Sequence, residues 1–94
     1  MEVKVLKKTP TELEIEVEGA GHTLCNLLQK RLLEDETVEL AGYSIPHPLA
    51  SNPIIYVRMK GNARPEPALR RAAEKARKIN EVFMKELEKA LKKT

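Results

Sequence analysis

The sequence of 94 residues contains one cysteine, three aromatic residues and no tryptophan. A single cysteine, Cys25, cannot form a disulfide within the chain or a cysteine-based metal cluster, so a reducing setting and a cytoplasmic location are expected. So few aromatic rings argue against a base-stacking platform for nucleic acid, and they leave the core to Leu, Ile, Val and Ala. The length fits one domain, residues 1–94, and is too short for a multidomain enzyme.

We also expect no secretory leader, no membrane span and no phosphate-binding loop in this sequence. The charged segment Glu2-Val3-Lys4 follows Met1 directly, and the longest uncharged stretch, residues 40–57, contains three prolines that exclude a continuous helix. Gly19-Ala20-Gly21 has neither the lysine nor the spacing of a P-loop. We therefore expect no membrane contact, no cofactor and no small-molecule substrate.

The positive charge is concentrated in the last third of the chain. Residues 1–61 carry a net charge of −2, whereas residues 62–94 carry +5. The cations of the second segment are interleaved with glutamates, which is typical of a solvated helix face. A basic-helix nucleic-acid-binding module remains an alternative, although phosphate binding favours uncompensated cations. Its candidate residues are Arg64, Arg70, Arg71, Lys75, Arg77 and Lys78.

Alternation of apolar and polar residues predicts four strands. Residues 11–18 place Leu13, Ile15 and Val17 on one face and four glutamates on the other, as in a half-buried antiparallel strand. Residues 3–5 begin the same pattern, and a turn at residues 7–10 would join the two strands in a hairpin. The period of two returns at residues 38–43 and 54–59, on either side of a proline-rich loop.

Two helices complete the predicted fold. Leu24, Leu27, Leu28 and Leu32 recur at helical spacing and predict a helix that ends near Glu34. Residues 65–93 contain no glycine or proline after Pro67 and predict one long C-terminal helix. The order ββαββα indicates an α+β fold, a four-stranded antiparallel sheet with two helices on one face.

The predicted C-terminal helix would be longer than the domain that it covers. About 29 residues at 1.5 Å each span roughly 43 Å, whereas a domain of this size is about 32 Å across. The overhanging part would carry Phe83, Leu87 and Leu91, which are costly to leave in water. This argument predicts a partner that covers the overhang, either a different subunit or a second copy of the chain.

Two chemical sites can be considered near the first helix. Cys25 would lie in the first helical turn, where the helix dipole lowers a thiol pKa, and His22 lies three residues upstream. No third residue that would orient this pair is evident, and free cysteines are commonly buried as small apolar residues. His22, Cys25 and His47 are too few for a structural zinc site. No catalytic and no metal-binding residues are therefore expected.

Two segments resemble a known family. They are His22-Thr23-Leu24-Cys25-Asn26 and Pro46-His47-Pro48-Leu49, with Ala41-Gly42-Tyr43 and residues 53–57 at similar spacing. Together they resemble the alpha-like small subunits of multisubunit RNA polymerases, the family that includes archaeal subunit L and the bacterial alpha N-terminal domain. The positions that match the family motif are His22, Thr23, Leu24, Asn26, Pro46, His47, Pro48 and Leu49.

The resemblance implies the alpha-like dimerisation fold and a non-catalytic role in transcription. The chain would heterodimerise with the alpha-like RNA polymerase subunit called D and form a platform for the large catalytic subunits, and it would meet DNA only through the complex. His22 and Asn26 would fix the loop-to-helix junction. A homodimeric scaffold would satisfy the same apolar pattern and remains open. The residues implied for the partner interface, shared with the core, are Leu24, Leu27, Leu28, Leu32, Ile79, Phe83, Leu87 and Leu91.

Overall fold

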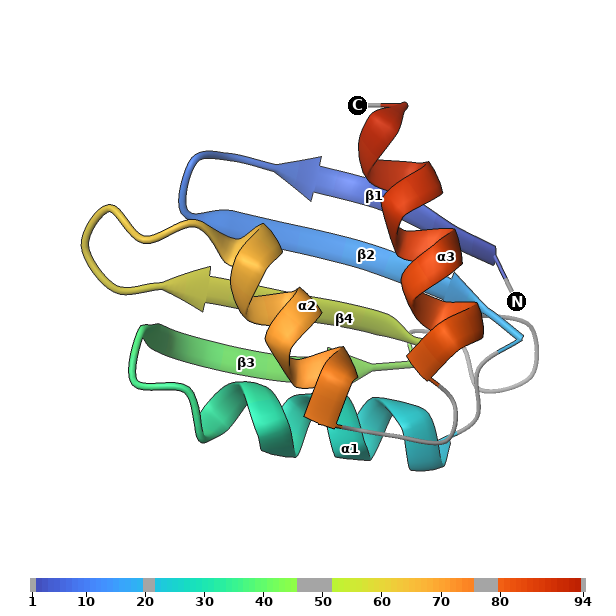
Figure 1. Cartoon of the computed structure of the whole chain (residues 1–94), viewed down its shortest axis with the longest axis horizontal. Helices are drawn as coiled ribbons and strands as arrows, with labels where there is room; N and C mark the ends of the chain where they lie inside the picture. Colours follow the sequence, from blue (N-terminus) through green and yellow to red (C-terminus); the bar gives the residue numbers. More distant parts are fainter. Residues whose placement is uncertain (1, 20–21, 46–51, 76–79, 94) are drawn as a thin grey trace.

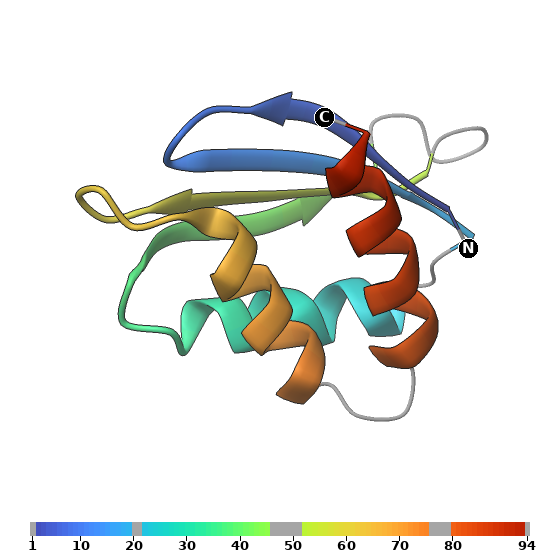
Figure 2. The ribbon, with the colours of Figure 1, turned by 45° about the horizontal axis from the view of Figure 1, so that its top comes forward.

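One antiparallel sheet and three helices make up the computed structural model, which describes residues 2–19, 22–45, 52–75 and 80–93. The four strands lie in the order β1-β2-β4-β3, and the helices cover one face of the sheet (Figures 1 and 2). The predicted α+β fold and its order of strands along the chain are confirmed. The elements are β1 (Glu2–Lys8), β2 (Glu12–Glu18), α1 (His22–Leu33), β3 (Val38–Ser44), β4 (Ile54–Met59), α2 (Pro65–Lys75) and α3 (Asn80–Lys92).

The central strands β2 and β4 follow the alternation of their sequences. Leu13, Ile15 and Val17 of β2 are buried beneath the helices, and their neighbours on the opposite face are half-buried or exposed. The β1–β2 turn is closed at Thr9, whose Oγ1 accepts a hydrogen bond of 2.9 Å from the Glu12 amide. A bulge in β1 between Val5 and Lys7 shifts the register and leaves Leu6 exposed.

The single long helix predicted for residues 65–93 is wrong. The structure has two helices in this region, α2 and α3, which run in different directions across the sheet (Figure 1). Residues 76–79 lie outside the described part of the chain. The change of direction lets α3 pack on β1, where Phe83 and Leu87 are fully buried. Burial of such side chains contributes about 1.5–3 kcal/mol each, which outweighs the small local preference for continuing a helix.

The overhang argument fails for the same reason. The molecule measures 36 × 25 × 24 Å, shorter than the roughly 43 Å of a continuous helix. Phe83 and Leu87 are each 0% exposed because the chain's own sheet covers them. The need for a partner therefore cannot be inferred from the length of the C-terminal segment.

Candidate dimerisation surface

Leu33 on helix α1 is the exposed large apolar side chain among the helical residues whose burial the structure describes. Helix α1 lies along the β3 edge of the sheet and contacts β3 and α2 (Figure 2). Leu24, Leu28 and Leu32 point into the core and are buried. Leu27 is half-buried and Leu33 is 55% exposed. The outer side of α1 thus carries leucine side chains that the chain itself does not cover.

The predicted interface residues on α3 are not adjacent to those on α1. Helix α3 packs on β1, at the opposite edge of the sheet from α1. Its Leu91 is half-buried and packs against the core, as does Met84. The structure therefore does not bring Leu27 and Leu91 together, and Ile79 lies outside the described residues. The five remaining predicted interface residues are part of the chain's own core: Leu24, Leu28, Leu32, Phe83 and Leu87.

Sequence reasoning did not assign Leu33 to the interface. Leu33 follows Leu32 directly and flanks the apolar stripe, so the periodicity gave no reason to separate it from core residues. Its exposure is decided by the packing of α2, which reaches the inner side of α1 and leaves the outer side open.

The family-motif residues fall into two groups. Helix α1 begins at His22, whose side chain is outside the described set, and Thr23 and Asn26 are exposed on α1. Within the described ranges Asn26 makes no side-chain hydrogen bond, so the role at the loop-to-helix junction that the resemblance implies for it has no observed contact. Pro46, His47, Pro48 and Leu49 lie outside the described residues.

Ion pairs hold α2 to its neighbours. Arg71 donates from Nε and Nη2 to Asp35 Oδ2, at 2.9 and 2.8 Å, and so joins α2 to the turn after α1. Desolvation raises the pKa of Asp35, but hydrogen bonds from Thr37 and Arg71 outweigh it and lower that pKa to about 2. This ion pair thereby fixes α2 relative to the end of α1.

The thiol of Cys25 is not suited to nucleophilic catalysis. Cys25 is fully buried among core residues, and desolvation raises its pKa. The helix dipole considered from sequence is therefore outweighed by burial. Among the residues that the structure describes, no group of three or more His, Cys, Asp or Glu side chains could hold a metal ion.

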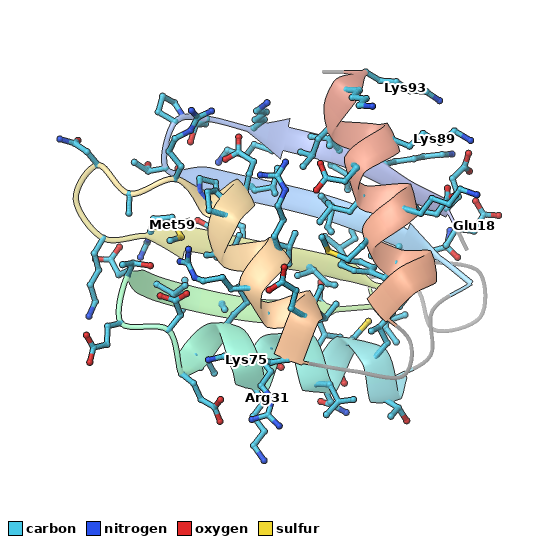
Figure 3. All side chains as sticks on the ribbon, viewed as in Figure 1. Glu18, Arg31, Met59, Lys75, Lys89 and Lys93 are labelled. Carbon is cyan, nitrogen blue, oxygen red and sulfur yellow. The ribbon has the colours of Figure 1, made fainter. Side chains whose placement is uncertain are left out.

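The cations of the C-terminal segment do not form a continuous basic surface in the described part of the chain. Arg64 lies 3.7 Å from Glu66, Arg70 pairs with Glu88 and Arg71 pairs with Asp35. Lys89 and Lys93 extend outward from α3 (Figure 3). Arg77 and Lys78 lie outside the described residues. No helix in the described ranges is both long and apolar enough to cross a membrane.

Comparison with known proteins identifies the family. The model of the RNA polymerase Rpb3/Rpb11 dimerisation domain matches residues 12–86. The DNA-directed RNA polymerase subunit Rpo11 of Methanocella arvoryzae is 41% identical over 85 residues, which are 90% of this chain and 91% of the relative. Rpo11 of Methanothrix thermoacetophila is 41% identical over 92 residues, 98% of this chain and 100% of the relative.

A solved structure agrees with the sequence matches. The crystal structure of DNA-directed RNA polymerase subunit L from Thermoplasma acidophilum superimposes with a TM-score of 0.72 at 32% identity, covering 98% of this chain and 90% of that one. These relatives are named as subunits of DNA-directed RNA polymerase. The chain therefore belongs to the RNA polymerase Rpb3/Rpb11 dimerisation family, as a subunit of an archaeal-type DNA-directed RNA polymerase.

Proposed function

We propose that residues 1–94 act as one dimerisation domain that pairs with a second alpha-like polymerase subunit, the one called D, and forms a platform for the large catalytic subunits. We refer to this second subunit as the alpha-like partner. The complex would work in the cytoplasm and contact DNA through its other subunits. The observation that carries the proposal is the uncovered leucine surface of α1 in a chain that matches a dimerisation-domain family over residues 12–86.

The contact would be centred on Leu33 and Leu27. Leu33 is 55% exposed and Leu27 is half-buried, so a partner could remove apolar surface from water at both positions. Leu24, Leu28 and Leu32 would support this surface from the core side and keep α1 in place. For the second half of the predicted interface, half-buried Leu91 on α3 is the described residue with accessible apolar surface.

The test uses the full chain, alone and co-expressed with a candidate alpha-like partner, measured by size exclusion coupled to light scattering. We expect a one-to-one complex from the wild type. Leu33→Asp should weaken this complex by about tenfold or more, because the carboxylate would be buried at the contact. Leu33 is exposed in the lone chain, so its substitution should leave the fold intact, which circular dichroism would check.

Leu6→Asp is the matched control. Leu6 is 46% exposed, close to the value for Leu33, but it lies on β1 and away from α1. This variant should pair with the alpha-like partner as the wild type does. Equal pairing by the Leu33 and Leu6 variants would contradict the assignment of α1 to the interface. A tight homodimer that ignores the alpha-like partner would replace the proposal with a homodimeric scaffold.

A further inference from the structure

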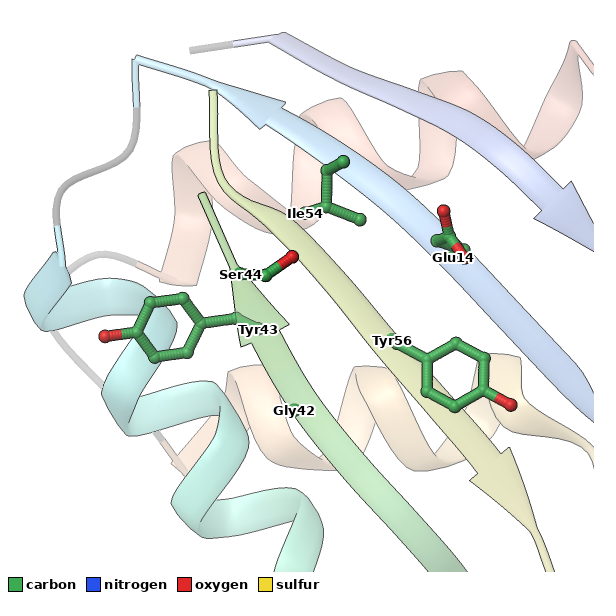
Figure 4. A pocket seen from close by; sticks show the side chains of 6 residues that line it. All are labelled: Glu14, Gly42, Tyr43, Ser44, Ile54 and Tyr56. Carbon is green, nitrogen blue, oxygen red and sulfur yellow. The ribbon is translucent and has the colours of Figure 1, made fainter. Parts of the chain in front are cut away.

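The face of the sheet opposite the helices contains a hollow at Gly42. Neighbouring residues on β2, β4 and β3 form one row across the sheet, in which Glu14 pairs with Tyr56 and Tyr56 with Gly42. The hollow is open and has a volume of about 270 Å³. We call it the Gly42 hollow. Its lining residues, shown in Figure 4, are Glu14, Gly42, Tyr43, Ser44, Ile54 and Tyr56.

The chain's own fold does not require glycine at position 42. Glycine weakens the interior of a strand, so it usually marks a special backbone conformation or a close approach. The glycines with positive φ in the described ranges are Gly19 and Gly61, and Gly42 is not among them. A Cβ atom at Gly42 would meet a single neighbouring group within 4 Å, Gln29 Nε2 at 4.0 Å. A Cβ atom at position 42 would thus make only an ordinary contact, with Gln29, and the open hollow on this face lets another molecule approach the backbone.

The walls of the hollow combine apolar surface with a carboxylate. Ile54 offers an aliphatic wall, and the hydroxyl of Tyr56 donates a hydrogen bond to Glu12, which fixes the aromatic ring. Glu14 has no ion pair with any cation in the described ranges, whereas two cations on this face have other partners. Lys7 is the cross-strand neighbour of Glu14 on β1, but its Nζ lies 3.6 Å from Glu12 Oε1. Arg58 Nε lies 2.8 Å from Glu39 Oε1.

The carboxylates around the Gly42 hollow favour a positively charged ligand. Glu12, Glu14 and Glu16 project from β2 on this face, and the remaining cation, Lys4, lies opposite Glu16 on the edge strand β1. A row of carboxylates repels phosphate, so nucleic acid is not the expected occupant. A cation with an apolar stem would instead match the carboxylate, the aliphatic wall and the aromatic ring together.

We propose that the Gly42 hollow binds a lysine or arginine side chain from a neighbouring subunit of the polymerase. The stem of that side chain lies over Gly42 between Ile54 and Tyr56, and its charged group pairs with Glu14. The surface is on the opposite side of the sheet from the helices, so it adds a second contact to the proposed pairing through α1. Only the choice of a polymerase subunit as the partner depends on the proposed assembly role.

The experiment compares variants in a polymerase reconstituted from separately expressed subunits. Gly42→Leu places a bulky side chain at the hollow, at a position where a Cβ atom makes only an ordinary contact with Gln29, and Glu14→Lys places a like charge against the incoming cation. We expect both to pair with the alpha-like partner as the wild type does but to bind the remaining subunits about tenfold or more weakly. Glu36→Lys is the matched control, because Glu36 is exposed in the turn between α1 and β3; it should assemble normally.

A photo-reactive residue at Leu40 identifies the partner. Leu40 is exposed on β3, two residues before Gly42. The cross-linked peptide should come from another subunit and contain lysine or arginine. Normal incorporation of both Gly42→Leu and Glu14→Lys would overturn the proposal, as would a cross-link to a second copy of this chain. Failure of the wild type to pair with the alpha-like partner would count against the proposed function instead, since the hollow is judged by incorporation relative to the wild type.

Discussion

Arg70 of α2 and Glu88 of α3, which are 18 positions apart in the sequence, form a two-point ion pair that joins the two helices. Arg70 donates from Nε and from Nη2, the second at 2.9 Å to Glu88 Oε1. Helical spacing alone would favour pairs within one turn, Arg70 with Glu66 and Glu88 with Lys92. Glu66 is buried and lies 3.6 Å from Lys8, and α2 and α3 are held together by the longer-range pair.

We expect Arg70→Ala to destabilise the lone chain by less than about 1 kcal/mol at pH 7. The two side chains are 39% and 38% exposed, so water and salt screen the interaction. The hydrogen bond from Arg70 lowers the pKa of Glu88, so the stabilisation is present above the ordinary carboxyl pKa and is lost as the pH falls below it. Urea unfolding of wild type and variant at pH 7 and pH 3 would measure this. If the difference in unfolding free energy between wild type and variant were larger at pH 3 than at pH 7, the stabilisation would not come from this ion pair.

Asp35→Asn should cost more than the loss of Arg70. The pKa of Asp35 falls from 3.8 to about 2, which corresponds to roughly 1–2 kcal/mol after allowance for the half-exposed Arg71. Because the folded-state pKa is lowered, this stability is complete above pH 4 and is lost as the pH falls through 2. Urea unfolding between pH 7 and pH 2 should show the variant approaching the wild type at low pH. Glu36→Gln, at a neighbouring exposed carboxyl, is the matched control variant.

Substitution of Leu87 tests whether α3 is part of the hydrophobic core of the lone chain. The overhang argument would have made Leu87→Asp a pure interface variant, but Leu87 is fully buried against the chain's own sheet. We therefore expect Leu87→Ala to lower the free energy of unfolding of the lone chain by about 2–5 kcal/mol. Leu91→Ala, at a half-buried position on the same helix, should cost clearly less. Chemical denaturation without any partner distinguishes the two, and equal small losses would mean that α3 does not pack on β1.

Cys25 should be unreactive in the native chain. Burial raises the pKa of its thiol and hides it from reagents. Labelling with iodoacetamide at pH 8 should be slower by about a hundredfold or more than in the same chain unfolded in urea, because it requires local or global unfolding. Rapid labelling of the native protein, at a rate close to that of the unfolded chain, would reopen the possibility of a reactive cysteine.

Local patterns along the chain were sufficient to predict the sheet and the position of α1. A period of two decides which side chains of β2 and β4 face the helices, because successive residues of a strand point to opposite faces. Leu24, Leu28 and Leu32 follow from helical spacing in the same way. These patterns can be recognised in the sequence without knowing which elements pack against each other. The family resemblance also came from short segments whose residues are adjacent in the chain.

Long-range packing determined the remaining features. The alanine-rich, charged segment after Pro67 has a high helix preference throughout, so nothing local showed that it would form two helices. The decisive contacts are between α3 and β1 and between Arg70 and Glu88, which join residues far apart in the sequence. The packing of the helices buries Phe83 and Leu87 and leaves Leu33 exposed, and the pairing of β2, β4 and β3 brings together the residues that line the hollow at Gly42. Apolar burial depends on what covers a residue, and periodicity does not contain that information.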